Sequence, residues 1–238
     1  MTVKAQWLGH AAFRLDSNGT TVVIDPFFTG NPKYDEANKP EKIDLLLVTH
    51  GHNDHFGDTI ALAKEFKPTI PVIHEMSLYL NQQLGEDSGV NVVGMNFGGT
   101  FTHESGIEVT LVPSSHSGGY TDQAGKTHYL GNPGGYVIKF PSGETFYHGG
   151  DTGVTKEMEI TRELFSPKIG LLAIGGHYTM DPKGAAHAAK LLGLETVIPI
   201  HFGTWNPPLA GTPEQLSEAL SGSDIRVVAL QPGESTEF

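Results

Sequence analysis

The sequence predicts an α/β fold in which two β-sheets pack against each other and helices cover their outer faces. Segments of β-branched and apolar residues outnumber helical segments, and the helical segments follow strands. One order of strand, histidine-bearing loop and helix occupies residues 45–66 and recurs at residues 171–192. Elements of this kind bury their apolar faces by stacking in layers. We therefore expect residues 1–238 to form one domain built of two pseudo-symmetric halves.

The first half alternates predicted strands with two predicted helices. Apolar and β-branched composition predicts strands at residues 4–8, 12–15, 20–24, 43–48, 71–74 and 90–95. A stretch rich in Gly, Pro and Asn predicts a loop over residues 27–42. Helical spacing of apolar residues leads to Phe66 and ends before Pro68, and a second helix is predicted over residues 77–84.

The second half repeats strand and helix signals with clearer helix caps. Strands are predicted as a pair within residues 101–113 and at residues 136–140, 145–148, 169–174, 196–200 and 225–230. Asp181 and Pro182 supply an N-cap and a first-turn proline for a helix that ends near Leu192. Thr212 and Gln215 have capping-box spacing for a helix that reaches about Leu220.

Composition predicts a folded, soluble protein of the cytoplasm. Apolar residues make up 38% and charged residues 18% of the 238 residues. The apolar runs are far shorter than the roughly 20 residues that span a bilayer, and the N-terminus shows no secretory signal. The chain has no cysteine, so disulfides and thiolate metal ligands are excluded.

Charge and motifs exclude several classes of function. The formal net charge is −12, from 15 basic and 27 acidic residues, which disfavours nucleic acid because binding it depends on neutralising phosphates. The phosphate-loop pattern and the G-x-S-x-G nucleophile elbow are both absent from the sequence. The expected partners are a small-molecule substrate and, as an alternative to a monomer, further copies of the same chain.

Ligand-type residues stand at the ends of apolar strands, where a rigid scaffold can bring side chains together. These residues are His50, His116, Asp151, His177 and His201. Around the first of them lies a dense cluster, and side chains two residues apart in extended backbone, such as His50 and His52, point the same way. A turn eased by Gly51 and Asn53 would let Asp54 and His55 face a second metal ion nearby. Imidazoles and carboxylates are ligands that zinc, iron and manganese accept, so a metal site outweighs a solvated polar turn.

The spacing H-x-H-x-D-H at His50, His52, Asp54 and His55 resembles the hallmark of the metallo-β-lactamase superfamily. His116, Asp151 and His201 fit the three later ligand positions, and residues 7–11 and 23–27 look like the superfamily's start. The chain is most similar to its compact branch of UPF0173-like metal-dependent hydrolases, near the lactonases that open sugar-acid lactones. This resemblance implies a four-layer αββα sandwich with metals at the edge between the sheets.

The resemblance also implies a ligand assignment. His50, His52 and His116 would hold one metal ion, Asp54, His55 and His201 the other, and Asp151 would bridge them. The expected cofactors are two divalent ions, zinc first and Mn²⁺ or Fe²⁺ as alternatives. A hydroxide held between the ions would be the nucleophile, because bound metal lowers the pKa of water from 15.7 to about 7. Asp54 would have a catalytic role, orienting the hydroxide or protonating the leaving group.

Several residues have two interpretations at this stage. Asp25 either accepts a hydrogen bond from a ligand imidazole or forms an Asx-Pro turn. His10 lines the pocket or is structural, and residues 205–208 form a pocket wall or only a turn. His177 and Tyr178 are candidate substrate contacts, with a loop role as the alternative. A structural role is expected for His148, and surface positions for His74, His103, His128 and His187.

The predicted function is hydrolysis of a small ester-like bond by a dinuclear centre, with a lactone slightly favoured. The closest alternative is a phosphodiesterase acting on a small or phospholipid-like substrate, and a β-lactam is a further one. From other classes, a redox iron protein would resemble superfamily members that replace a cluster histidine and carry a flavin domain, whereas this chain keeps His55. A non-catalytic metal-binding protein would be expected to lose ligands, and all seven are present.

Overall fold

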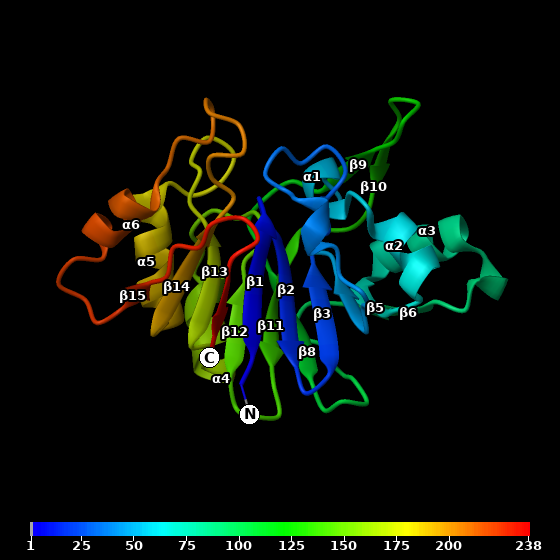
Figure 1. Cartoon of the computed structure of the whole chain (residues 1–238), viewed down its shortest axis with the longest axis horizontal. Helices are drawn as coiled ribbons and strands as arrows, with labels where there is room; N and C mark the ends of the chain where they lie inside the picture. The colour runs from blue at the N-terminus through cyan, green and yellow to red at the C-terminus, as the bar shows by residue number, and fades with distance from the viewer. Residues whose placement is uncertain (1) are drawn as a thin grey trace.

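The computed structural model describes residues 2–238 and contains two seven-stranded β-sheets packed face to face (Figure 1). The first sheet has the order β16 (Ser235–Glu237), β1 (Lys4–Gly9), β2 (Ala12–Ser17), β3 (Thr20–Ile24), β4 (Leu45–Leu47), β5 (Thr69–Ile73) and β6 (Asn91–Met95). The second has the order β15 (Arg226–Val227), β14 (Thr196–Ile200), β13 (Ile169–Ala173), β12 (Thr145–His148), β11 (Gly134–Lys139), β8 (Glu108–Pro113) and β7 (Thr100–Thr102). A small ribbon pairs β9 (Gly119–Thr121) with β10 (Thr127–Tyr129).

Helices lie on both outer flanks of the paired sheets (Figure 1). On the flank of the first sheet are α2 (Thr59–Phe66) and α3 (His74–Leu84), and on the flank of the second are α4 (Glu157–Phe165), α5 (Pro182–Leu192) and α6 (Pro213–Ala219). Short helices α1 (Asn53–Phe56), η1 (Glu36–Asn38) and η2 (Glu86–Ser88) lie in connections. This arrangement of layers is the αββα sandwich that the resemblance implies.

The two sheets share one pattern of strand directions. From β16 to β3 the three pairings are antiparallel, and from β3 to β6 the three pairings are parallel. The second sheet repeats this, antiparallel from β7 to β12 and parallel from β12 to β15. The shared pattern is consistent with two pseudo-symmetric halves, which stay a prediction. Because parallel strands end at the same edge of a sheet, β3, β4, β12, β13 and β14 deliver their following residues to one end of the molecule.

Apolar side chains fill two layers of core. One cluster lies between the sheets and includes Leu15 and Leu45 from the first sheet and Ile138 from the second. A second cluster lies between the second sheet and its helices, where Val137 of β11 packs near Ala185 of α5. Adjacent residues of β11 thus serve opposite faces, as the two-residue period of a strand requires.

Some elements differ from those that the sequence predicts. The β9–β10 ribbon, α4 and β16 are not predicted, because their strands are short and polar and α4 has no side-chain N-cap bond. A strand is predicted over residues 225–230, but the observed strand β15 covers only Arg226–Val227. Helix α3 begins at His74, three residues before the predicted start, and His74 itself belongs to the predicted strand over residues 71–74.

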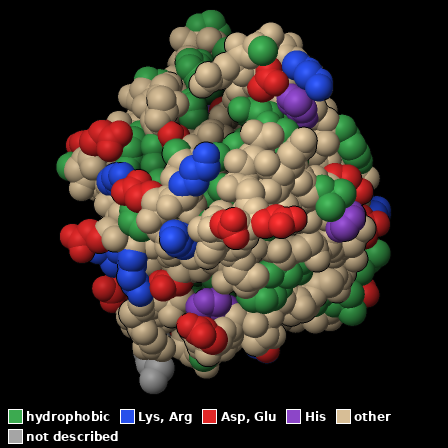
Figure 2. Space-filling model, turned by 90° about the vertical axis from the view of Figure 1, so that its right-hand side faces the viewer, with side chains coloured by type: hydrophobic (Ala, Val, Ile, Leu, Met, Phe, Trp, Pro, Cys, Tyr) green, Lys and Arg blue, Asp and Glu red, His purple; other side chains and the backbone are tan. Residues whose placement is uncertain are grey.

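Acidic and basic side chains are both present on the surface of the molecule (Figure 2). On the flank that carries α2 and α3, acidic and basic side chains are scattered singly, and the part that the structure describes shows no continuous basic patch there (Figure 2). No helix within residues 2–238 combines the length and the apolar composition that a bilayer crossing requires.

Tyr136 fastens the two sheets together and yields a test of the fold. Its buried hydroxyl lies on β11 and donates to the carbonyl oxygens of Val48 and Pro71, each 3.0 Å away, in the segments of β4 and β5. We expect Tyr136→Phe to lower the free energy of unfolding by about 1–3 kcal/mol, because buried carbonyls lose a donor. Urea denaturation measures this, with Tyr129→Phe as control because Tyr129 is 67% exposed. Equal stability of the two variants would contradict a role for Tyr136 between the sheets.

Candidate metal centre

Seven ligand-type side chains from both sheets meet at the end where the parallel strands finish. His50 and His52 follow β4, and α1 presents Asp54 and His55 one turn later. From the second sheet, His116 follows β8, Asp151 follows β12 and His201 follows β14 directly. The structure therefore brings together all seven residues that the sequence analysis proposes as ligands.

Three histidines form one group of potential ligand atoms. The side-chain nitrogens of His50, His52 and His116 lie within 4.8 Å of one another, and His50 Nε2 is 3.0 Å from His52 Nδ1. Gly51 makes this approach of the two loops feasible, because a Cβ there would lie 2.7 Å from the carbonyl oxygen of Gly118. The group is partly open to solvent, since His52 and His116 are half-buried.

A second group lies beside the first. Ligand atoms of Asp54, His55, His201 and also His10 lie within 4.8 Å of one another. His10 Nε2 is 3.0 Å from Asp54 Oδ2, and His201 Nε2 is 3.8 Å from the same oxygen. His10, His55 and His201 are buried, whereas the side chain of Asp54 is 27% exposed and can meet a molecule from solvent.

Asp151 lies between the two groups. Its Oδ2 is 3.5 Å from His116 Nε2 and 3.1 Å from His201 Nε2, and its Oδ1 is 3.3 Å from His55 Nε2. The preceding residue, Gly150, has a φ of +56°, and a Cβ there would lie 2.7 Å from the side chain of Thr49. Only glycine permits this tight approach, which brings the Asp151 loop against the segment that carries His50.

Asp25 forms a hydrogen bond with one of the candidate ligands. Its Oδ2 accepts a hydrogen bond of 2.8 Å from His55 Nδ1 and one of 2.7 Å from Thr49 Oγ1, while Oδ1 accepts from the backbone N–H of Thr49. The carboxylate therefore orients the His55 ring and leaves Nε2 as the nitrogen that can bind a metal.

Burial and neighbouring charges divide the histidines into two kinds. Burial lowers the pKa of His50 well below its ordinary value and the pKa of His10 to about 4, so both are neutral imidazoles. Burial also opposes a charge on His201 and His55, but the Asp151 carboxylate outweighs it. It raises the pKa of His201 to about 9 and, together with Asp25, holds the pKa of His55 well above its usual range.

Buried polar atoms without hydrogen bonds test whether metal ions fit. Within residues 2–238, His55 Nε2, Asp151 Oδ1 and both ring nitrogens of His201 are buried and lack a hydrogen-bond partner. The nitrogen–oxygen distances from His55 and His201 to Asp151 are those of ion pairs. The orientation of these side chains, however, does not allow hydrogen bonds between them. Buried polar groups of this kind are costly, and nitrogen and carboxylate oxygen are donors that Zn²⁺ accepts. The donor set therefore fits divalent metal ions.

Four residues at this end have an unusual backbone conformation. His10, Asp25, His177 and His201 have positive φ values between +48° and +57°, a region that costs a non-glycine residue about 1 kcal/mol or more. His10, Asp25 and His201 each follow a strand directly and take part in the contacts around Asp54, His55 and Asp151, whereas His177 lies further along the loop after β13. The fold thus tolerates strain where it directs side chains into the centre.

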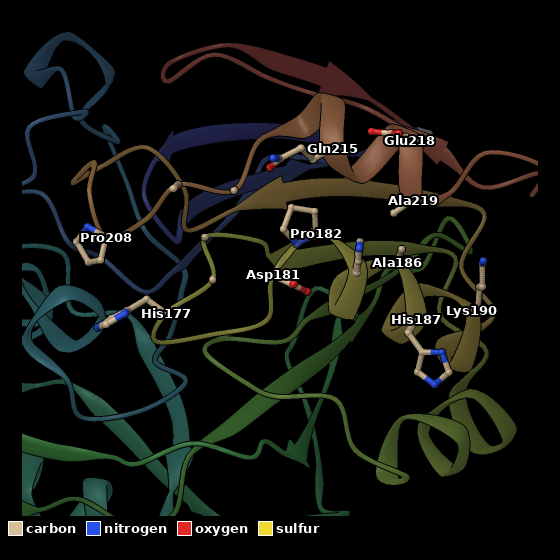
Figure 3. Close-up of a pocket in the computed structure, with 15 residues that line it drawn as sticks. His177, Asp181, Pro182, Ala186, His187, Lys190, Pro208, Gln215, Glu218 and Ala219 are labelled. Atoms are coloured by element: carbon tan, nitrogen blue, oxygen red, sulfur yellow. The ribbon is translucent and has the colours of Figure 1, made fainter.

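His177 and Tyr178 lie near the centre but do not contact its ligands. Their loop joins the Asp151 loop through the N–H of Met180, which donates to the carbonyl oxygen of Thr152. The His177 ring packs on Tyr178 and lines one end of a cavity of about 920 Å³ that extends along α5 and α6 (Figure 3). None of the seven candidate ligands lines this cavity.

The remaining histidines divide as follows. His148 is buried and structural, because its Nε2 bonds the carbonyl oxygen of Ala11 and its Nδ1 accepts from the N–H of Gly150. His74 and His187 are exposed as expected. His103 and His128 lie at the surface but are partly covered: His103 contacts Ser105, and His128 pairs with Asp122 at 2.7 Å.

Trp205 lies beside the centre, and its role as a pocket wall stays a prediction. Its ring is 39% exposed, and its centroid lies 5.1 Å from that of His10 and 6.0 Å from that of Phe27. Since His10 contacts Asp54, an apolar surface stands one side chain away from a candidate ligand. No local pattern in the sequence predicts the contacts of Trp205 with His10 and Phe27, because they join segments far apart along the chain.

The family model described as Beta-lactamase superfamily domain matches residues 20–202. Over 236 residues the chain is 44% identical to a UPF0173 metal-dependent hydrolase from Koribacter versatilis, covering 98% of this chain and 97% of the relative. It is 43% identical to a UPF0173 metal-dependent hydrolase from Methanopyrus kandleri, covering 99% of this chain and 100% of the relative. The solved structure of Igni18, a metallo hydrolase from Ignicoccus hospitalis, is similar with a TM-score of 0.87 at 35% identity, covering 100% and 99% of the two chains.

The raised pKa of His201 predicts how the metal-free protein responds to pH. A folded-state pKa of about 9, against about 6.5 in the unfolded chain, means that the protonated imidazole stabilises the fold. This contribution is complete below pH 6.5 and is lost as pH rises through 9, and His55 acts in the same direction. Chelator-treated protein should lose about 3 kcal/mol of unfolding free energy across this window, measured by urea denaturation.

His201→Gln is the control for this pH dependence. Its unfolding free energy should vary less with pH between 6.5 and 9 than that of the parent chain, because one of the two raised histidines is gone. A parent chain whose stability is constant over this window would contradict the pairing of His201 with Asp151.

Proposed function

The chain belongs to the beta-lactamase superfamily and within it to the UPF0173 metal-dependent hydrolases, and on this premise we propose that it hydrolyses a small ester-like bond at a dinuclear metal centre. It is a metal-dependent hydrolase. We propose zinc as the metal, with Mn²⁺ and Fe²⁺ as alternatives that the same donors accept. A lactone is the substrate that we favour among carboxylic esters.

The observation that carries the dinuclear proposal is the position of Asp151 between two groups of ligand atoms. His50, His52 and His116 would hold one ion, and Asp54, His55 and His201 the other. Asp151 approaches the first group through Oδ2 and the second through both oxygens. A carboxylate has two oxygens and can serve both ions.

Divalent ions bound there supply Lewis acidity, because they lower the pKa of water to about 7 and polarise the oxygen of the bond under attack. Asp54 is the chain's own group for orienting the nucleophile. Burial raises its pKa, but the hydrogen bond from His10 and the nearby His201 hold the pKa well below its usual range, so the carboxylate is an acceptor. We propose that Asp54 accepts a hydrogen bond from the attacking hydroxide and orients it, with protonation of the leaving group as the alternative role.

The surroundings of the centre favour an uncharged substrate over a phosphodiester. Within residues 2–238 no lysine or arginine forms an ion pair or a hydrogen bond with the seven candidate ligands. The exposed face of Trp205, with Phe27 behind it, offers apolar contact instead. An ester or lactone with a small apolar part fits these surroundings better than an anion.

His177 and Tyr178 stay proposed substrate contacts at the outer rim. Tyr178 is 57% exposed, and their loop is joined to the Asp151 loop by a backbone hydrogen bond.

Asp151→Ala tests the metal centre directly. We expect the variant to fold but to bind less than two equivalents of zinc, because the carboxylate proposed to serve both ions is lost. Its hydrolytic rate should fall by at least about 100-fold. Metal content by elemental analysis and hydrolysis of lactones, carboxyl esters, thioesters, phosphodiesters and β-lactams measure this. Lys64→Ala, an exposed residue of α2 that lies outside the centre and outside the cavity at α5 and α6, is the control.

Two outcomes would contradict parts of this proposal. Two zinc ions and full activity in Asp151→Ala would exclude a bridging role. Cleavage of phosphodiesters alone by the zinc-loaded parent chain would exclude the ester and favour the phosphodiesterase, while leaving the metal centre intact.

A further inference from the structure

His10 is a buried histidine with a hydrogen-bond partner at each ring nitrogen. Its Nε2 is 3.0 Å from Asp54 Oδ2, and its Nδ1 is 2.9 Å from Thr204 Oγ1. We propose that His10 is a positioning residue, which donates from Nε2 to Asp54 Oδ2 and leaves Oδ1 as the oxygen available to a metal ion. This inference rests on the proposed metal centre and assigns a role to a residue outside its seven ligands.

The chemistry of the two partners fixes which nitrogen of His10 carries the proton. An ionised carboxylate can only accept, so the ring must donate to Asp54 from Nε2. The neutral imidazole then has a lone pair at Nδ1, and the hydroxyl of Thr204 can donate to it. Thr204, His10 and Asp54 therefore form a chain of hydrogen bonds with a single direction.

The neutral form of His10 fits its surroundings. The residue has no exposed surface, and the ring centroid of His201, a candidate ligand, is 3.9 Å away. A neutral donor can orient Asp54 without adding positive charge beside the metal ions.

The backbone holds the His10 ring in place from several sides. Residue 10 has a φ of +57° and follows a register shift at the end of β1. Its carbonyl oxygen accepts hydrogen bonds from the Trp7 indole and from the backbone N–H of His201, both of 2.9 Å. The same residue thus contacts two candidate ligands, His201 through its backbone and Asp54 through its ring.

A direct role of His10 as a metal ligand is the competing interpretation. Its ring nitrogen lies within 4.8 Å of ligand atoms of Asp54, His55 and His201. Nε2 is the nitrogen that faces these atoms, however, and in the hydrogen-bonded arrangement it carries a proton. A ligand role would require the opposite tautomer, with the proton on Nδ1 and a bond donated to Thr204.

Zinc titration of the chelator-treated chain and its variants tests the positioning role. The parent chain should bind two zinc ions, and failure to do so would refute the proposed centre rather than this inference. His10→Phe keeps a flat ring but has no donor, so we expect one of the two zinc affinities to fall by about 10- to 100-fold. His10→Gln retains an N–H that can reach Asp54 and should recover most of that loss.

Further variants separate positioning from a general effect on the fold. Thr204→Val removes the outer partner and should weaken the same zinc affinity by a few fold, whereas Thr204→Ser should not. Urea denaturation of each metal-free variant reports stability independently. If His10→Phe lowers stability but leaves both zinc affinities unchanged, the role is structural and the proposal is wrong. If His10→Phe does not fold, the pair of Thr204 variants decides by the same criterion.

Nitrogen-15 NMR of the histidine rings in the zinc-loaded parent chain decides between positioning and ligation. We expect the His10 signals of a neutral ring protonated at Nε2, assigned by their loss in His10→Phe. A ring protonated at Nδ1, with coupling to ¹¹³Cd after metal exchange, would show that His10 is a ligand and would overturn the proposal.

Discussion

The buried carboxylate of Asp25 is the constraint on which the rest of the centre depends. An ionised group with no exposed surface costs several kcal/mol unless it is paired and hydrogen-bonded. Asp25 meets this requirement with Thr49 and His55, and this fixes the segment between β4 and α1. The carbonyl oxygen of Thr49 in turn accepts from Gly134 of β11, in the other sheet. One carboxylate thus links both sheets to the orientation of a candidate ligand.

The centre combines neutral and cationic imidazoles in a small volume. His10 and His50 lose their charge to burial, while His55 and His201 hold a proton because Asp151 stands between them. Metal ions bind the neutral form of histidine, so binding must release protons from these two residues. The same carboxylate that stabilises the protons would then hold the ions, and the charge around Asp151 is balanced in either state.

Local signals in the sequence predict two sheets with helices outside and the first ligand cluster, and the resemblance to the superfamily adds the later ligands and the four-layer order. Composition is enough to predict apolar strands, and the residues from His50 to His55 lie within one short segment. The same reasoning leaves Asp25 and His10 undecided, since their partners are distant: His10 contacts Asp54 and Thr204, which lie 44 and 194 residues away. Short polar strands such as β9 and β16 have no periodic pattern. They form because they pair with β10 and β1. Contacts of this kind arise from the closed fold and leave no mark in local composition.

The pairing of β16 with β1 has a consequence for synthesis of the chain. Lys4 lies opposite Glu237, so β1 is made long before the outer strand with which it pairs. Until then the free edge of β1 presents unpaired N–H and C=O groups, which are a template for pairing with other chains. His201 and Thr204 are also made late, after the other six candidate ligands. During synthesis the first sheet therefore has an unpaired edge, and the set of candidate ligands stays incomplete until His201 is made.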